Sequence, residues 1–254
     1  MRFFASILAL LLVSCGSQSN SALEGLGYSG AGKNVAVLIG APNNLPGVGT
    51  DVREMTKMFQ DTSYNFYFTV SANASANKAA VMSTTANAVK DADSVFWFFS
   101  GHGGNGILLA QGSQTFTFKE VVAAIKAVRT TPFKRLIVML DSCESGSFVD
   151  GSSAIITESA KSVYQELDRD PSLYEQAFVM SASLKNENAS DLGSAKGGAF
   201  TYAMRTTMAK PTATFKDLAN GTIPLAQSEG SQTPGYRAFP KDDVMNDYLF
   251  LYRM

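Results

Sequence analysis

Short, continuously apolar runs alternate with helix-like segments along most of this chain. The four clearest runs cover residues 35–39, 94–99, 135–140 and 177–182. A run that is apolar at nearly every position is typical of a strand buried on both faces, as in a parallel sheet. The segments between the runs are long enough to hold crossover helices. The sequence therefore predicts an α/β fold with a mainly parallel, doubly wound central sheet.

The remaining elements are expected from turn residues and helix-capping patterns. We expect helices over residues 50–60, 77–92, 119–128 and 198–208, a strand over 66–70, a hairpin of strands 106–109 and 115–118, and a last strand over 248–252. Thr50 or Asp51 is expected to cap the first helix. Ligands of doubly wound sheets bind beyond the carboxyl ends of the strands, so functional residues are expected there.

The composition fits one globular domain of ordinary size. The chain has 254 residues, of which 45% are hydrophobic and 17% are charged, and its formal net charge is −1. This composition supplies enough apolar material for a core. A nucleic-acid-binding protein normally carries a basic stripe, so the near-zero charge argues against nucleic acid as a partner.

The first fifteen residues form a distinct segment. Arg2 is followed by an apolar run over residues 3–13 and then by small residues, which is typical of a secretory signal rather than of a membrane-spanning helix. The ending Leu12-Val13-Ser14-Cys15 resembles a bacterial lipobox, which implies that Cys15 is acylated and begins the mature protein. The alternative is an ordinary signal peptide with an incidental cysteine.

These features predict three parts of the chain. We expect a lipoprotein signal peptide over residues 1–14, a flexible tether rich in Gly and Ser over residues 15–33, and a single domain over residues 34–254. Stable attachment to a membrane needs more than one acyl chain, which a multiply acylated Cys15 would supply.

Apart from Cys15, the chain has one cysteine and one histidine, and each follows an apolar run. His102 lies in Ser100-Gly101-His102-Gly103-Gly104, and Cys143 lies in Asp141-Ser142-Cys143-Glu144-Ser145-Gly146. A thiol with a free pKa of about 8.5 becomes an efficient nucleophile when an imidazole takes its proton. The glycines leave the Gly103 N–H free to face a developing oxyanion, and the Cys143 N–H is the expected second donor. This pattern predicts acyl-transfer chemistry.

Other interpretations of the two motifs are also open. A lone cysteine is commonly a buried apolar filler, and a lone histidine is commonly a satisfied polar residue. A catalytic zinc site usually draws on several ligands, so one His and one Cys argue against a metal here. The His-Gly-Gly segment lacks the Lys-Ser/Thr of a phosphate-binding loop and the glycine spacing of a dinucleotide-binding loop. The chain has no Gly-x-Ser-x-Gly motif of a serine hydrolase. Together, the motifs favour a cysteine nucleophile paired with a histidine.

Both motifs, in this order after apolar strands, resemble those of the caspase-like cysteine peptidases, which include the caspases, the metacaspases, their bacterial relatives and the legumains. Supporting segments cover residues 49–52, 179–183, 198–202 and 232–234. The resemblance implies a three-layer α/β/α sandwich, with Cys143 as the nucleophile, His102 as the general acid and base, and the N–H groups of Gly103 and Cys143 as oxyanion donors. It also implies a protein or peptide substrate and no cofactor for the chemistry.

The resemblance extends to the pocket for the P1 side chain of the substrate. In caspases, this pocket holds an arginine four residues before the aspartate of the Gly-Thr-Asp motif and a glutamine two residues before the nucleophile, whereas here these positions are Gly47 and Asp141. The acidic pocket of metacaspases maps onto Asp51, Ser100 and Asp141. Two carboxylates would favour Arg or Lys through charge-assisted hydrogen bonds. The structural alternatives are a helix cap for Asp51 and a turn residue for Asp141.

The sequence thus predicts a bacterial, membrane-anchored cysteine endopeptidase that cleaves after Arg or Lys through a thioester acyl-enzyme. The expected location is the cell envelope, with a lipid membrane contacted through acylated Cys15. Residues 102–108 and 143–147 are as similar to legumains, so cleavage after Asn is an alternative. The others are a transpeptidase, in which an amine captures the thioester, and a non-catalytic lipoprotein that uses the fold as a binding module.

Regulation is the least determined property at the level of sequence. Asp242 and Asp243 are a sparse acidic feature for the calcium that activates many metacaspases, so calcium activation stays open. The polar segment over residues 147–176 occupies the place where caspases are cut during activation. Self-processing in this segment is therefore a hypothesis.

Overall fold

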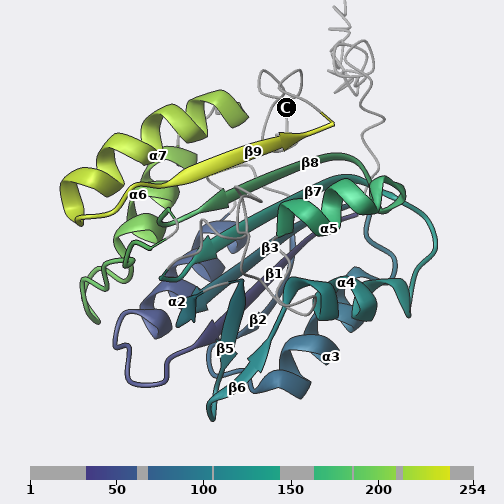
Figure 1. The fold of residues 1–254 in the computed structure, drawn as a ribbon, viewed down its shortest axis with the longest axis horizontal. Coiled ribbons are helices and arrows are strands. Elements are labelled where there is room, and N and C mark those ends of the chain that lie inside the picture. Colours follow the sequence, from purple (N-terminus) through teal and green to yellow (C-terminus); the bar gives the residue numbers. More distant parts are fainter. Residues whose placement is uncertain are drawn as a thin grey trace, which may run out of the picture. The chain divides into compact units, whose positions relative to one another are not determined.

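The computed structural model describes residues 33–61, 68–104, 106–143, 163–184, 186–209 and 214–240. These residues are built around a six-stranded sheet with the strand order β2-β1-β3-β7-β8-β9 (Figure 1). The parallel strands are β1 (Asn34–Ala41), β2 (Thr69–Asn73), β3 (Ser94–Gly101), β7 (Phe133–Asp141) and β8 (Tyr174–Ser181), and β9 (Gly235–Phe239) pairs antiparallel with β8. The predicted mainly parallel sheet is confirmed.

The central strands are buried on both faces, as their apolar runs predict. All eight residues of β1 are buried. Their side chains alternate, so that Val35, Val37 and Ile39 join one hydrophobic cluster while Ala36 and Leu38 join another on the opposite face. A strand that must fill two cores has no exposed position for a polar residue, which explains the continuous apolar pattern.

Each face of the sheet is covered by helices. On one face lie α3 (Lys78–Val89), α4 (Phe118–Lys126) and α5 (Val163–Arg169), and on the other lie α2 (Val48–Gln60), α6 (Ala199–Met208) and α7 (Phe215–Glu229). Val81, Val121 and Leu167 anchor the first layer. Met55 and Met204 anchor the second. The predicted α/β/α sandwich is confirmed.

A three-stranded sheet lies beyond the end of β3. It consists of β4 (Gly103–Gly104), β5 (Ile107–Ala110) and β6 (Gln114–Phe116) in antiparallel order. The predicted hairpin is present, but its second strand ends at Phe116 because Thr117 forms a capping box with Glu120 and α4 begins at Phe118. β4 contains Gly103, so this small sheet also fixes the backbone beside His102.

The structure differs from the sequence expectation at several elements, among them β2, α7 and β9. β2 begins at Thr69, later than predicted, and residues 66 and 67 lie outside the described part of the chain. α7 and β9 were not predicted: α7 contains Pro224 and Gly221, which weaken the helical pattern. The strand predicted over residues 248–252 lies outside the described residues.

The predicted signal peptide and tether cannot be compared with the fold. Residues 1–32 lie outside the described part of the chain, so the boundaries at residues 14, 33 and 254 stay predictions. Among the described residues, no helix has both the length and the apolar content needed to cross a membrane.

Candidate active site

The site forms where β3 and β7 end side by side. These strands are parallel neighbours, and the last register pairs are Phe99 with Leu140 and Ser100 with Asp141. The chain leaves both strands at the same edge of the sheet, so the motifs around His102 and Cys143 converge there. Both residues line a single pocket, which they share with further residues: Leu45, Val48, Asp51, Ser100, Gly101, Asp141, Ser142, Ala189, Ser190, Asp191 and Gly198.

His102 is held by its backbone and by its ring. Its carbonyl accepts a hydrogen bond from the N–H of Leu109, which ties it to β5. Its Nε2 lies 3.1 Å from the carbonyl oxygen of Asn43. Because a carbonyl oxygen can only accept, Nε2 carries the ring proton in the neutral imidazole. Nδ1 is thereby left to accept or donate the proton of a reacting group.

Asn43 is itself fixed to the turn between β5 and β6. Its side-chain amide donates to the carbonyl of Ala110 at 2.9 Å, and its side-chain oxygen accepts from the N–H of Gly112 at 3.2 Å. Its φ of 37° lies in the left-handed region, which asparagine tolerates better than most residues. The carbonyl that holds His102 therefore belongs to a residue anchored on both sides. The sequence prediction did not identify Asn43, because a backbone carbonyl leaves no side-chain signature.

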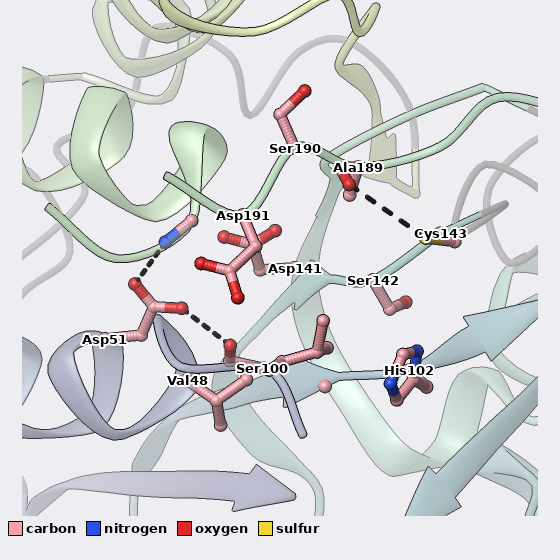
Figure 2. A pocket seen from close by; sticks show the side chains of 13 residues that line it. Val48, Asp51, Ser100, His102, Asp141, Ser142, Cys143, Ala189, Ser190 and Asp191 are labelled. Atoms are coloured by element: carbon pink, nitrogen blue, oxygen red, sulfur yellow. Dashed lines mark hydrogen bonds between the residues drawn. The ribbon is translucent and has the colours of Figure 1, made fainter. Parts of the chain in front are cut away.

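Cys143 follows the end of β7 by two residues and is partly exposed to the pocket. Its sulfur lies 4.0 Å from the carbonyl oxygen of Ala189, at the outer limit of an S–H hydrogen bond (Figure 2). The preceding carbonyl of Ser142 accepts from the hydroxyl of Ser183. The sulfur and the His102 ring are thus each in contact with a backbone carbonyl, that of Ala189 and that of Asn43. Thiol and imidazole line one pocket.

Gly103, the first predicted oxyanion donor, follows His102 at the start of β4. The pair His102 and Leu109 is hydrogen-bonded, and hydrogen-bonded pairs alternate with non-bonded pairs along antiparallel strands. The N–H of Gly103 therefore points away from β5. A Cβ at this position would lie 2.8 Å from the Ser142 hydroxyl oxygen, so only glycine fits without a shift.

Two carboxylates lie buried on the other side of the pocket (Figure 2). Asp51 is 2% exposed and accepts hydrogen bonds from the Ser100 hydroxyl at 2.7 Å and the Gly198 N–H at 2.8 Å. Asp141 is 6% exposed and accepts from the N–H and the hydroxyl of Thr201. In the described part of the chain, neither carboxylate has a cationic partner. The pocket beside the thiol therefore has two buried carboxylates in its lining.

The structure supports neither of the structural alternatives, which were a helix cap for Asp51 and a turn residue for Asp141. Helix α2 begins at Val48 with Gly47 at the cap position, so the expected cap at Thr50 or Asp51 is wrong. The carboxylate of Asp51 instead crosses to Ser100 and Gly198. Asp141 is the last residue of β7 rather than a turn residue.

Burial and nearby negative charge raise the pKa of both carboxyl groups. Burial, followed by the charge of Asp141, raises the pKa of Asp51 well above its ordinary value. Burial raises the pKa of Asp141 to about 6, against the hydrogen bonds from Thr201 that lower it. Buried carboxylates without a cation titrate in this direction because the charged form loses its hydration. Without a substrate, the two carboxyl groups therefore keep a proton at pH values at which an exposed carboxyl group has already lost its proton.

A third aspartate, Asp191, lines the same pocket and was missed by the sequence prediction. It lies on an exposed turn and forms an isolated bridge with Gly198. No apolar strand precedes it, so nothing in the local sequence marks it as part of a site. Its charge acts on both Asp51 and Asp141.

The next two predictions concern a calcium site and a self-processing segment. Within the described ranges, no group of three or more His, Cys, Asp or Glu side chains could hold a metal ion. Asp242 and Asp243 lie outside those ranges, as do residues 144–162 of the predicted processing segment.

Comparison with known protein families identifies the domain. A family model described as a caspase domain matches residues 33–244, a range that includes every strand and helix described above. No curated protein matches the chain at a significant level.

Proposed function

Because this chain belongs to the caspase domain family of cysteine peptidases, we propose that it is an endopeptidase with Cys143 as the nucleophile and His102 as the general acid and base. One observation carries the proposal: the thiol, the imidazole and two buried carboxylates line a single pocket at the carboxyl ends of β3 and β7. A protein scaffold has no need of this combination. Its protein or peptide substrate follows from the family.

The proposed reaction has two stages. His102 takes the thiol proton, and the Cys143 sulfur forms a bond to the carbonyl carbon of the substrate as the π electrons move to its oxygen. The N–H groups of Gly103 and Cys143 stabilise this oxyanion. The carbon–nitrogen bond then breaks, His102 gives its proton to the leaving amine, and a thioester remains. Water then attacks the thioester carbonyl carbon as His102 takes its proton. The carbon–sulfur bond breaks, His102 returns the proton to the sulfur of Cys143, and the acid product leaves.

Asn43 supports this sequence of proton transfers. Its carbonyl keeps a hydrogen bond to Nε2 of His102 in both the neutral and the protonated ring. A positively charged imidazolium beside a carbonyl oxygen is stabilised by a charge-assisted hydrogen bond. The ring therefore keeps its orientation while Nδ1 exchanges the proton. No cofactor takes part in these steps.

We assign the buried carboxylates to the P1 pocket. Among the described residues, Asp51 and Asp141 have no cationic partner, and the Ser100 hydroxyl donates a hydrogen bond to Asp51. A guanidinium or ammonium group of the substrate would neutralise them and satisfy their remaining acceptor positions. The proposed preference is therefore Arg or Lys at P1. An Asn side chain at P1 would leave the charge of the two carboxylates without a partner. Cleavage after Asn is therefore the second candidate, and it is based on the sequence resemblance to legumains.

The N-terminal segment adds a proposed location. Acylation of Cys15 would tether the domain to a membrane of a bacterial cell envelope, with residues 15–33 as the spacer. This proposal rests on the lipobox-like ending Leu12-Val13-Ser14-Cys15.

A P1-scanning peptide library tests the function. The wild-type protein should cleave peptides with Arg or Lys at P1, and the Cys143→Ala variant should cleave none. Turnover confined to Asn would replace the basic specificity with the legumain-like alternative. Products joined to an added amine would indicate transpeptidation. The complete absence of turnover, with a thiol inert to alkylation, would favour a binding module.

A further inference from the structure

Gln232 is a buried polar residue that does not itself line the pocket. It lies between α7 and β9, and only 3% of it is exposed. Its amide nitrogen donates to the carbonyl of Ala182 at 3.0 Å, and its amide oxygen accepts from the N–H of Ser190 at 2.6 Å. One side chain thus joins two separate points of the chain that follows β8.

These two points are the ends of one loop. We call residues 182–190 the pocket loop, and the structure describes all of them except residue 185. At the far end of the pocket loop, Ala189 and Ser190 line the same pocket as Cys143 and His102 (Figure 2). The contacts that hold this far end therefore help to set the shape of the pocket.

The near end of the pocket loop is held by β7. The N–H of Ala182 donates to the carbonyl of Leu140 at 2.8 Å, and the hydroxyl of Ser183 donates to the carbonyl of Ser142 at 3.3 Å. Neither hydrogen bond involves Gln232, and both lie close to the proposed nucleophile in the chain. The backbone beside the nucleophile therefore keeps this support when Gln232 is replaced.

The far end and the middle of the pocket loop are held by the segment before β9. A Cβ on Gly230 would lie 2.6 Å from the Cβ of Ser190, so the two backbones are in close contact. Gly230 has φ −145° and ψ 156°, which any residue adopts, so the space requires glycine and the conformation does not. In the middle of the loop, Glu187 accepts from the N–H of Thr233 at 2.9 Å.

A primary amide has the chemistry that the position of Gln232 needs. The side chain must donate to a carbonyl at one end of the loop and accept from an N–H at the other, and an amide carries both groups. A carboxylate accepts but does not donate, and methionine, of similar length, has only a weakly accepting sulfur. Loss of the amide leaves two buried backbone groups without this partner, which favours a shift of the loop.

We propose that Gln232 is a positioning residue of the peptidase, which holds the far end of the pocket loop in place for the substrate without touching the substrate. The inference rests on the proposed peptidase function. Gln232 acts through Ser190, whose N–H it binds. This end of the loop is a wall of the pocket, so its shift should weaken binding of any substrate that the enzyme cleaves and leave bond breaking nearly unchanged.

Steady-state kinetics of matched peptides with Arg or Lys at P1 test this inference on the full chain. Gln232→Met should raise KM about tenfold on both peptides and leave kcat within about threefold. The loop should shift rather than open, because the carbonyl of Ser190 keeps its hydrogen bond from the N–H of Ala199. KM does not depend on the amount of folded enzyme, so partial unfolding cannot imitate this result.

Gly230→Ala tests the same contact from the other side. The added Cβ must displace Ser190 while the amide of Gln232 stays in place, so KM should rise on both peptides again. Gly235→Ala is the matched glycine control, because a Cβ there meets its nearest neighbour at 3.4 Å, an ordinary contact. Gln227→Met, at an exposed position on α7, is the control for the methionine variant. Both controls should keep the wild-type KM.

The rate of alkylation by iodoacetamide separates positioning from reactivity. This small reagent needs only the thiol of Cys143, whose neighbouring backbone stays tied to the near end of the pocket loop. The rate constant in Gln232→Met should therefore stay within about twofold of the wild-type value. A thiol that becomes much less reactive would show that Gln232 acts on the nucleophile itself, and would overturn the inference.

The kinetic outcomes distinguish this inference from the proposed function. A wild-type enzyme that cleaves both peptides, with unchanged KM in Gln232→Met and Gly230→Ala, overturns the inference alone. A lower kcat at unchanged KM, or a change on one peptide only, also overturns it. If Gln232→Met does not fold, Gly230→Ala alone decides. A wild-type protein that cleaves neither peptide overturns the proposed function, and this inference with it.

Discussion

The imidazole Nε2 of His102 lies 3.1 Å from the backbone carbonyl oxygen of Asn43, which belongs to a different loop. The contact joins the carboxyl ends of β1 and β3, since Asn43 follows β1 and His102 follows β3. In the proposed mechanism, this contact keeps the proton on Nε2 and leaves Nδ1 for the reaction. The orientation of the imidazole ring therefore depends on how firmly the loop after β1 is held.

Asn43→Gly tests this dependence. Glycine accepts the positive φ of residue 43 but removes both side-chain hydrogen bonds to the turn between β5 and β6. We expect kcat on an Arg peptide to fall about tenfold while KM changes little, because proton transfer needs an oriented ring. Assays with a fluorogenic Arg peptide at several concentrations measure kcat and KM.

Asn44→Gly is the control for that variant. Asn44 also has a positive φ, of 75°, but its side chain has no hydrogen bond within the described residues. Its replacement should leave kcat close to the wild-type value. An equal loss in both variants would show that loop flexibility, rather than the Asn43 clamp, controls the rate.

Gly103→Ala tests the oxyanion assignment. The added Cβ would lie 2.8 Å from the Ser142 hydroxyl oxygen and 3.1 Å from a methyl carbon of Leu108, so the Gly103 peptide must shift. Removal of one oxyanion donor costs about 10²-fold to 10³-fold in kcat in acyl-transfer enzymes, and we expect a loss of this order. Affinity for an Arg peptide, measured in the Cys143→Ala background, should change little. A variant with wild-type kcat would remove Gly103 from the mechanism.

Much of this architecture follows from the sequence because strands buried on both faces admit only apolar residues. Residues 35–39 and 135–140 are predicted correctly for that reason, and with them the convergence of His102 and Cys143. Helix α7 escapes prediction because Gly221 and Pro224 interrupt its pattern. The reason for Gly221 is tertiary: its Cβ would lie 2.6 Å from the Thr207 methyl carbon of α6.

In the site, as in the fold, some residues are marked by a local sequence pattern and others depend on tertiary contacts. His102 and Cys143 occur in local motifs, so the sequence marks them directly. Asn43 acts through its backbone, and Asp191 reaches the pocket because Gly47 leaves room for it. Such contacts arise only when distant segments fold together, and a single sequence carries no local pattern for them.

The pH dependence of binding tests the acidic pocket. Since burial raises the pKa of Asp141 to about 6 and raises that of Asp51 as well, the ionised fraction of the pair increases as the pH rises from 5 to 8. A cation binds the ionised form, so the Kd of an Arg peptide for the Cys143→Ala variant should fall over this range.

A peptide with citrulline in place of arginine is the control for the pH experiment. Citrulline has nearly the same shape without the charge, so its weaker Kd should vary little with pH. Isothermal titration calorimetry measures both peptides under the same conditions. Equal pH profiles for the two peptides would contradict the role of Asp51 and Asp141 as partners of a cationic side chain.

Cys15→Ser tests the membrane anchor. The variant has no thiol to acylate, so we expect the protein to move from the membrane fraction to the soluble fraction when it is expressed in a bacterium. Mass spectrometry should find acyl chains on Cys15 of the wild-type protein only. Cys143→Ala serves as the matched cysteine control and should stay in the membrane fraction. Wild-type protein found without acyl chains would favour an ordinary signal peptide.

Covalent labelling with an acyloxymethyl ketone peptide tests the central claim most directly. A peptide with Arg at P1 should add one label per molecule, on Cys143, and peptide mapping by mass spectrometry locates it. The same peptide with norleucine at P1 should react far more slowly, and Cys143→Ala should take up no label. A label on another residue, or equal rates for the Arg and norleucine peptides, would contradict the account of Cys143 as the nucleophile beside an acidic P1 pocket.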